Sequence, residues 1–433
     1  MTYEQALAYI HGRRRGLPKP GLARMRELMR RLGDPQDQLR CVHVTGTNGK
    51  GSTTAMVAAA LQAAGYRVGR TVSPFVLEFR ERFQIDGEMI PPAALAALTE
   101  RVKAVCDAME GEGLYASEFE IDTAIAFLWF AAEGVDLVCL EVGMGGDTDA
   151  TNVIPAPLCC AITPISLDHT AALGPTTAAI AERKCGIIKG GAPVVCCAGQ
   201  DAAALAVIRA QCARRGSPLF LPDPEALRVA RIGLSGSTFA YRGLPYALSL
   251  AGEYQLQNAL TAIEVLRVLA AQGLAISQTA IRAGLAAVRF PARCERLGER
   301  PTLLLDGAHN PAGMAAFCRV VAAQDAPRKV AVTGLLRDKD APEIGRWLAG
   351  AFDALYLVAP PSERAADPAH LAAAFAAQGL PATPCASLEE ALAAARAELP
   401  PEGLLAVCGS LYLASEARPL LLAMGRGERT PDR

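Results

Sequence analysis

The sequence predicts an α/β protein of two domains, the first built on a doubly wound, mostly parallel sheet. The chain has 433 residues, too many for one ordinary core, and its 51% hydrophobic and 20% charged residues are typical of a globular protein. Short apolar runs alternate with helical patterns in both halves of the chain. A glycine-rich loop separates the first apolar run from the first long helical pattern, as in proteins that bind phosphate at a sheet edge.

The elements of the first domain follow one another in a regular order. Apolar runs bounded by turn residues predict buried strands at residues 39–44, 67–71, 135–141, 158–163 and 193–197. Asp86-Gly87 in the middle of residues 83–90 indicates a hairpin. Apolar residues at helical spacing predict helices at residues 52–64, 92–109 and 118–132.

The pattern changes twice after residue 217. Residues 217–250 are short, alternating and glycine-punctuated, which predicts a small antiparallel sheet packed on the first domain, and helices are expected at 256–269 and 277–288. Beyond Phe290-Pro291 the alternation restarts and predicts a smaller, Rossmann-like α/β domain. Its strands are expected at residues 302–305, 329–333, 354–358 and 404–407, and its helices at 312–322, 369–378 and 387–399. We therefore expect domains at residues 1–292 and 293–433.

Charge and cysteine content limit the classes of function. The 43 lysines and arginines balance 44 acidic residues, so no general basic field would attract nucleic acid. The chain starts without a secretory signal and has no apolar run long enough for a membrane span, so we expect a cytoplasmic protein. Its 13 cysteines form no C-x-x-C pair, which favours buried reduced thiols over a zinc site.

The glycine-rich loop carries the first functional prediction. It reads Thr45-Gly46-Thr47-Asn48-Gly49-Lys50-Gly51-Ser52. Its glycines would let the backbone approach a phosphate, Lys50 would reach the outer phosphates of a nucleotide, and Ser52 or Thr53 could touch magnesium. Because Gly46 lies only four residues before Lys50, the general P-loop spacing is not satisfied. Physical reasoning alone thus supports an anion site.

The full string resembles the phosphate loop of the folylpolyglutamate synthase and dihydrofolate synthase family, a branch of the Mur ligases. Further segments of this chain, up to Ser410, also resemble motifs of this family. They are Ser73-Pro74-Phe75, Glu141-Val142-Gly143, Leu167-Asp168-His169, Phe290-Pro291-Ala292-Arg293, Asp306-Gly307-Ala308-His309-Asn310-Pro311 and Gly409-Ser410-Leu411. The chain departs from the family pattern at three places. It has Ala292 for a usual glycine, Phe75 for histidine or tyrosine, and Asp147-Thr148 for arginine and leucine.

The resemblance implies an ATP-dependent ligase that adds L-glutamate to the γ-carboxylate of folylglutamates through an acyl phosphate, with dihydropteroate as a second acceptor to be tested. It implies that ATP binds at Thr47, Asn48, Gly49, Lys50, Gly51, Ser52, Asn258, Arg293 and Asp306. It also implies two magnesium sites, held by Ser73, Glu141, His169 and a carbamylated Lys184. Lys50, Arg293 and His309 are the expected catalytic residues, and Asp306, His309, Asn310 and Ser410 the expected substrate contacts.

Plainer interpretations of these residues stay open. Lys184 could be a surface lysine, Arg293 a solvated hinge residue, and Ser410 a helix cap, while His309 could shape the cleft rather than accept the amine proton. A Mur-type amino acid ligase of cell-wall precursors is one rival, and Gly51 with the Ser73-Pro74 loop argues against it. A non-ligase P-loop ATPase is another, and it would not need the strings near residues 306 and 410. The expected partners are a folate or dihydropteroate and L-glutamate, with neither nucleic acid nor membrane, and the expected state is a monomer.

Overall fold

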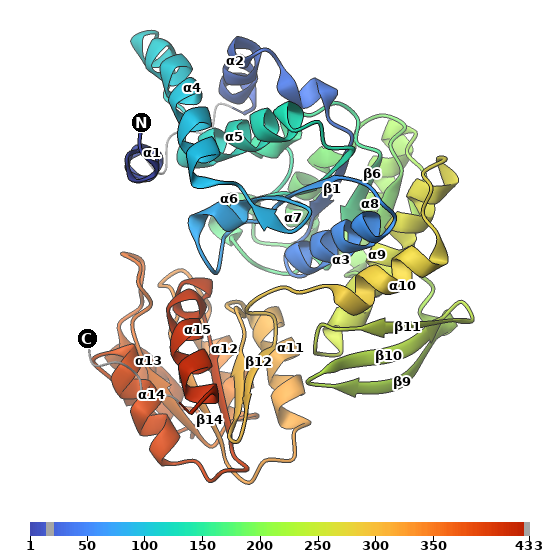
Figure 1. Cartoon of the computed structure of the whole chain (residues 1–433). Coiled ribbons are helices and arrows are strands. Elements are labelled where there is room, and N and C mark those ends of the chain that lie inside the picture. The colour runs from blue at the N-terminus through green and yellow to red at the C-terminus, as the bar shows by residue number, and fades with distance from the viewer. Residues whose placement is uncertain (14–20, 428–433) are drawn as a thin grey trace. The chain divides into compact units, whose positions relative to one another are not determined.

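The computed structural model describes residues 1–13 and 21–427 of the chain (Figure 1). It divides into two compact units. The first comprises Met1–Arg228, Ala240–Tyr246 and Gln257–Val288, and the second comprises Val229–Phe239, Ala247–Leu256 and Arg289–Arg433. The predicted boundary between residues 292 and 293 stays a prediction, although the last change of unit falls after Val288.

An eight-stranded sheet forms the centre of the first unit, in the order β4-β3-β2-β5-β1-β6-β7-β8. Six of its strands are parallel, β3 is antiparallel to β2, and β4 is antiparallel to β3. The strands are β1 Cys41–Thr45, β2 Val68–Thr71, β3 Phe83–Ile85, β4 Glu88–Met89, β5 Leu137–Glu141, β6 Cys159–Ile162, β7 Val194–Cys196 and β8 Leu219–Phe220. Val44 pairs with Glu141 and Thr45 with Ile162, so the carboxyl ends of the central strands meet at one edge.

Helices cover this sheet, and some of them are buried on nearly every side. The helices are α1 Tyr3–His11, α2 Ala23–Leu32, α3 Lys50–Ala63, α4 Pro92–Gly111, α5 Glu118–Ala132, α6 Thr170–Leu173, α7 Thr177–Lys184, α8 Ala202–Arg215, α9 Tyr254–Ala271 and α10 Gln278–Ala287. Helices α3 and α5 are examples, and α9 is buried to a similar degree. A Cβ on Gly284 would lie 2.4 Å from the backbone of Ala60, so glycine lets α10 pack directly on α3.

A separate three-stranded sheet lies between residues 227 and 248 of the chain. It consists of β9 Leu227–Gly233, β10 Gly236–Tyr241 and β11 Leu244–Leu248, arranged as β11-β10-β9. The division between the units passes through this sheet and again through α9. The small sheet predicted within residues 217–250 is therefore present, but Leu219–Phe220 pair with β7 of the large sheet instead.

The second unit has a six-stranded sheet in the order β12-β13-β17-β14-β15-β16. All its strands are parallel except β12, which is antiparallel to β13. The strands are β12 Glu295–Glu299, β13 Thr302–Leu305, β14 Lys329–Thr333, β15 Ala354–Leu357, β16 Ala382–Pro384 and β17 Leu404–Cys408. The helices are α11 Pro311–Ala322, α12 Ala341–Ala349, α13 Pro368–Ala376, α14 Leu388–Ala397 and α15 Leu411–Gly425.

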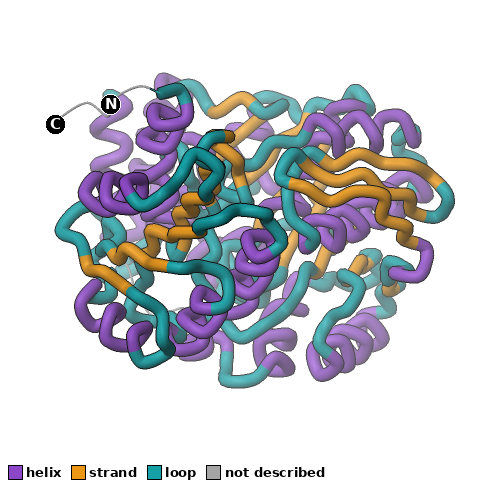
Figure 2. The backbone as a smooth tube through the Cα atoms, turned by 90° about the horizontal axis from the view of Figure 1, so that it is seen from below, coloured by secondary structure: helices purple, strands orange, loops and turns teal. Residues whose placement is uncertain are grey.

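The predicted fold class is confirmed, since Figure 2 shows strands lying among helices and both large sheets are mainly parallel. Each predicted strand is present within about two residues of its expected bounds. Helix α3 begins at Lys50, two residues before the predicted start. No range was predicted for helices α1, α2, α6, α7, α8, α12 and α15 or for strands β12 and β16. Among the described residues, no helix has the length and apolar character needed to span a bilayer.

Candidate functional site

The predicted residues of the first unit gather at the carboxyl edge of its sheet. Strands β2, β5, β1 and β6 are neighbours there, and each is followed by a loop that carries predicted residues. Ser73 follows β2, Glu141 ends β5, the glycine loop follows β1, and His169 follows β6. Open α/β sheets bind their ligands at this edge, because several loops converge on it.

Two glycines of the loop are required by close packing. A Cβ on Gly46, whose φ is +148°, would lie 1.8 Å from Oγ1 of Thr163. Gly49 has a φ of +85°, and a Cβ there would lie 2.3 Å from Oδ1 of Asn258. Any side chain at either position would therefore displace the loop. The second contact also places Asn258 beside the loop, as the sequence prediction requires.

The loop is fixed to the segment after β6. The amide groups of Thr47 and Asn48 both donate to the carbonyl oxygen of Pro164, at 2.9 and 3.3 Å. The Thr47 hydroxyl donates to the Ser166 carbonyl and accepts from its amide, each at 3.1 Å. Helix α3 then starts at Lys50, so a preformed helix N-terminus lies at the end of a rigid glycine turn. That combination favours the binding of an anion.

Lys50 and Lys184 converge on the same backbone oxygen. Lys50 Nζ donates to the carbonyl groups of Gly46 and Thr47, both at 3.1 Å, and Lys184 Nζ donates to Gly46 O at 2.5 Å. Lys184 ends α7 and is only 3% exposed, so it is not the surface lysine of the plainer interpretation. Burial, reinforced by the charge of Lys50, holds the pKa of Lys184 well below its usual value.

Ser73 and Glu141 lie together. The Ser73 amide donates to Oε2 of Glu141 at 3.3 Å, and the Glu141 amide donates to Oγ1 of Thr71 at 2.9 Å. Glu141 is 4% exposed. A buried carboxylate beside a serine hydroxyl supplies the oxygen ligands that magnesium prefers.

His169 lies in the next loop and is more open to solvent. Its side chain is 42% exposed, and its Nε2 is 4.0 Å from Oδ2 of Asp168. Its backbone has a φ of +50°, and its amide donates to Oδ1 of Asp168 at 2.9 Å. Asp168 thus contacts both the backbone and the ring of His169. The role of His169 as a metal ligand stays a prediction.

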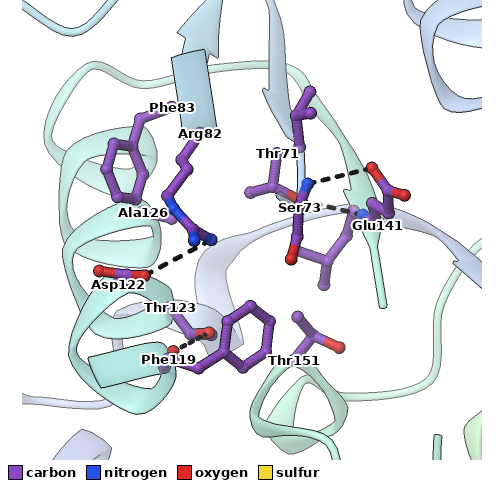
Figure 3. A pocket seen from close by; sticks show the side chains of 12 residues that line it. Thr71, Ser73, Arg82, Phe83, Phe119, Asp122, Thr123, Ala126, Glu141 and Thr151 are labelled. Atoms are coloured by element: carbon purple, nitrogen blue, oxygen red, sulfur yellow. Dashed lines mark hydrogen bonds and ion pairs between the residues drawn. The ribbon is translucent and has the colours of Figure 1, made fainter. Parts of the chain in front are cut away.

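Ser73 and Glu141 line a pocket together with Arg82 and Asp122, two polar residues to which the sequence analysis assigned no role. Figure 3 shows Arg82 pointing toward Asp122 in this pocket, with the ring of Phe119 nearby. The Nη1 of Arg82 is 3.6 Å from Oδ2 of Asp122, whose side chain is 4% exposed. The sequence marks Asp122 only weakly, as the last of three acidic residues, after Glu118 and Glu120, that precede the apolar part of α5.

The predicted residues of the second unit surround the ends of β13 and β17, which are parallel neighbours. Asp306 is 5% exposed and its carboxylate is already engaged within the unit. It accepts from the amides of Cys294 and Ala308, each at 2.7 Å, and from the Tyr254 hydroxyl at 3.2 Å. These bonds give Asp306 a structural role, while its expected contact with a nucleotide ribose stays a prediction.

Arg293 and His309 contact the same turn. Nη1 of Arg293 donates to the Ala292 carbonyl at 3.0 Å, and its guanidinium lies 5.0 Å from the centre of the Phe290 ring. A Cβ on Gly307 would lie 2.8 Å from Nη1 of Arg293, so this glycine leaves room for the guanidinium. Nδ1 of His309 is 2.8 Å from the Gly307 carbonyl oxygen, which orients the ring.

Asn310 and Ser410 are helix caps. The side-chain oxygen of Asn310 accepts from Gly313 N at 2.8 Å at the start of α11, and Ser410 Oγ accepts from Tyr412 N at 3.1 Å at the start of α15. Both residues are 2% exposed. The Gly409 amide donates to the Ala308 carbonyl at 2.8 Å, so the two caps belong to one group of loops. The cap that sequence analysis offered for Ser410 is therefore present, and its contact with glutamate stays a prediction.

The chain matches two known families along most of its length. Residues 44–266 match the Mur ligase middle domain, and residues 292–411 match the Mur ligase, glutamate ligase domain. The folylpolyglutamate synthase of Lacticaseibacillus casei is 38% identical over 434 residues, covering 98% of this chain and 99% of that protein. The dihydrofolate synthase/folylpolyglutamate synthase of Bacillus subtilis (strain 168) is 39% identical over 348 residues, covering 78% of this chain and 80% of that protein.

Solved structures agree with these matches. The Mycobacterium tuberculosis folylpolyglutamate synthase complexed with ADP has a TM-score of 0.89 and 34% sequence identity, with 99% of each chain covered. A folylpolyglutamate synthase complex with AMPPCP and folate has a TM-score of 0.85 and 36% identity, covering 98% of this chain and 100% of that one. Since both the whole sequence and the whole fold match, the chain belongs to the folylpolyglutamate synthase and dihydrofolate synthase family of Mur ligases.

Proposed function

We propose that this protein is an ATP-dependent ligase that adds L-glutamate to the γ-carboxylate of folates through an acyl phosphate. The observation that carries the proposal is the rigid glycine loop with Lys50 and Lys184 beside it, in a chain that matches nucleotide- and folate-bound relatives from end to end. Joining a carboxylate to an amine in water is uphill. Phosphorylation of the carboxylate by ATP provides a leaving group that the glutamate amine can displace.

Nucleotide phosphates would bind at the start of α3. The proposed contacts are the backbone and side chains of Thr47, Asn48, Gly49, Lys50, Gly51 and Ser52, with Asn258 beside them. Lys50 now donates to two carbonyl groups of its own loop, so its ammonium is already directed into the anion site. A positive charge held there offsets the negative charge that develops during phosphoryl transfer.

Magnesium would be bound by Ser73, Glu141, His169 and Lys184. The donor set fits: Ser73 and Glu141 adjoin each other, and Lys184 is buried with a depressed pKa, which favours the neutral amine that can take up carbon dioxide as a carbamate. Among described residues, no group of three or more His, Cys, Asp or Glu side chains could hold a metal by itself. Magnesium typically binds to one or two carboxylates plus phosphate and water oxygens, so a sparse protein site is expected. The bound cation would neutralise phosphate charge.

The residues of the second unit would bind the remaining parts of the substrates. Arg293 would neutralise the transferring phosphate, Asp306 would contact the nucleotide, and His309, Asn310 and Ser410 would contact glutamate. His309 is the candidate to accept the amine proton, and the contact of its Nδ1 with the Gly307 carbonyl orients its ring. We further propose a cytoplasmic location, which the 13 unpaired cysteines support, and a monomeric state.

The proposal is tested by measuring glutamate incorporation. Purified protein is supplied with ATP, magnesium and labelled L-glutamate, and tetrahydrofolate, dihydropteroate and a cell-wall nucleotide precursor are compared as acceptors. We expect incorporation with tetrahydrofolate and one ADP released for each glutamate added. Incorporation with dihydropteroate would add dihydrofolate synthase activity. ADP release without incorporation, or incorporation only into the cell-wall precursor, would refute the proposal.

A further inference from the structure

The turn of residues 292–294, which carries Arg293, has a backbone that its own residues do not favour. Ala292 and Cys294 flank Arg293, and their φ angles are +51° and +48°. A residue with a Cβ is strained at such angles, so two of them in one turn persist only where neighbouring groups impose the conformation. The groups around this turn therefore decide the direction in which Arg293 points.

Two carboxylates hold the backbone amides of the turn. Oε2 of Glu295 accepts from the Ala292 amide at 3.0 Å, and Oδ2 of Asp306 accepts from the Cys294 amide at 2.7 Å. The Ala292 carbonyl accepts from Nη1 of Arg293 at 3.0 Å. Both peptide groups that flank Arg293 are thus hydrogen-bonded, which fixes the direction in which its side chain leaves the backbone.

Glu295 is itself held by Arg418 of α15. Nε of Arg418 donates to the two carboxylate oxygens of Glu295 at 3.1 and 3.0 Å, and Nη2 donates to Oε1 at 2.7 Å. The side chains are 19% exposed for Glu295 and 25% for Arg418, so water screens the pair only in part. A pair with several bonds of this kind fixes the carboxylate more closely than one contact would.

The guanidinium of Arg293 contacts neutral groups. Its Nη1 donates to the Ala292 carbonyl, and it lies 5.0 Å from the centre of the Phe290 ring. These two contacts orient the cation without neutralising it. A cation held in this way is suited to a ligand that is an anion.

We propose that Glu295 is a positioning residue for Arg293: its carboxylate, held by Arg418, fixes the turn and so keeps the guanidinium in one direction before the transferring phosphate is bound. The inference rests on the proposed function, which gives Arg293 that phosphate as its ligand. An arginine that is already oriented loses little freedom when it binds the charge that develops in the transition state. Loss of Glu295 should therefore lower kcat more than it raises KM.

Steady-state glutamate incorporation by the whole chain, with ATP, magnesium and tetrahydrofolate, tests the assignment. Glu295→Ala should lower kcat about tenfold or more and leave each KM within about threefold of wild type, since a hydrogen bond to a charged group corresponds to roughly 10- to 100-fold. Glu295→Gln keeps an oxygen that can accept from the Ala292 amide, so its kcat should exceed that of Glu295→Ala at least about threefold. Arg418→Leu removes the group that holds Glu295 and should lower kcat about threefold or more.

A double variant separates positioning from general damage. If Glu295 acts only through Arg293, Glu295→Ala should change kcat less than about threefold in a chain that already carries Arg293→Ala. A purely structural role would instead produce the same fractional loss in both backgrounds.

Glu299→Ala is the matched control, because Glu299 lies on the same strand and pairs with Arg296 at the surface, and it should keep the wild-type kcat. The melting temperature of each variant reports folding, and Arg418→Leu decides the question if Glu295→Ala does not fold. A folded Glu295→Ala or Arg418→Leu variant with the wild-type kcat, or the same fractional loss with and without Arg293, would overturn the assignment. Failure of wild type to incorporate glutamate would instead refute the proposed reaction.

Discussion

Ala292 occupies a backbone conformation that usually belongs to glycine. Its φ is +51°, that of Cys294 two residues later is +48°, and the Ala292 side chain is fully buried. A left-handed alanine costs about 1–2 kcal/mol. Glycine would remove this cost but lose a buried methyl, worth about 0.8 kcal/mol, and gain freedom in the unfolded chain, worth about 0.4–1 kcal/mol. These terms nearly cancel, which explains how alanine is accommodated.

We therefore expect Ala292→Gly to change the free energy of unfolding by less than about 1 kcal/mol, and Ala292→Val to lower it by more than about 2 kcal/mol, because a β-branched side chain is strained at positive φ and has no space. Urea unfolding of the three proteins measures both effects. A valine variant as stable as wild type would contradict the strain that the backbone angle implies.

Asp122 should make stability depend on pH in an unusual direction. Its pKa in the fold is raised from 3.8 to about 7, chiefly by burial and further by Glu118, while Arg82 and His11 lower it. The native state therefore holds more protons than the unfolded chain between about pH 4 and pH 7, and the contribution of this group falls as pH rises through that window. Above the pKa of Asp122 in the folded protein, this group lowers the free energy of unfolding by its full amount, on the order of 4 kcal/mol.

Replacing Asp122 by asparagine should remove the part of the pH dependence of stability that Asp122 causes. Relative to wild type, the variant should gain stability as pH rises from 4 to 7 and then show a constant difference. The slope is the informative quantity, because leaving Arg82 without its partner adds a cost that does not depend on pH. Urea unfolding at several pH values measures it, and parallel pH profiles for the two proteins would show that Asp122 does not titrate in this window.

Sequence reasoning identified site residues where a motif accompanied them and overlooked those without one. Glu141 and Lys184 were predicted from strings, and the structure gives Lys184 a buried contact with the glycine loop. Glu81 and Arg82 were given no role, because their contacts depend on how residues 73–82 turn. Asp122 required knowing that α5 is buried on all faces, which no helical periodicity reveals.

At the scale of elements, Glu81 fixes the loop that carries Ser73. Its Oε2 accepts from the amides of Val76 and Leu77, at 2.7 and 2.8 Å, and its side chain is buried. Hydrogen bonds to a charged acceptor contribute about 1.5–3 kcal/mol each, but Leu77 is exposed enough for water to replace one of them. Glu81→Ala should therefore lower stability by about 2–3 kcal/mol and loosen the loop.

If the loop that carries Ser73 is less well ordered, the enzyme should need more magnesium for activity. We expect Glu81→Ala to raise the magnesium concentration needed for half-maximal glutamate incorporation several-fold, with a smaller change in the KM for folate. Glu78→Ala is the matched control, because Glu78 pairs with Arg80 at the surface. An unchanged magnesium response in a folded Glu81 variant would limit this residue to a purely structural role.

The elements that escaped prediction had weak or ambiguous patterns. Strand β12 reads Glu-Arg-Leu-Gly-Glu and is mostly exposed, so its strand conformation depends on antiparallel pairing with β13 rather than on an apolar run. Helix α2 did carry a signal, since Met25, Leu28, Met29 and Leu32 form one buried stripe and Gly33 ends the helix at a φ of +89°. Its arginine-rich outer face obscured that stripe.

At the scale of the whole molecule, each unit has a core of its own. The first unit packs α1, α2, α4 and α5 on one part of its sheet and α7 and α8 on another, while the second unit packs α11, α12 and α13 on its sheet. Since the glycine loop belongs to the first unit, binding of nucleotide phosphates should stabilise that unit directly. The linkage between binding and stability makes this measurable in the intact chain.

Calorimetric melting with and without AMPPCP provides the test. At a ligand concentration about 1,000 times the dissociation constant, the transition of the first unit should gain roughly 4 kcal/mol. Lys50→Ala should lose most of this gain, because the ammonium that faces the phosphate site is removed, whereas its melting temperature without ligand should change little. Lys103→Ala, which removes a charge from an exposed pair with Asp107, should keep the full gain. A Lys50 variant that AMPPCP stabilises as strongly as wild type would mean that the nucleotide does not bind at the glycine loop.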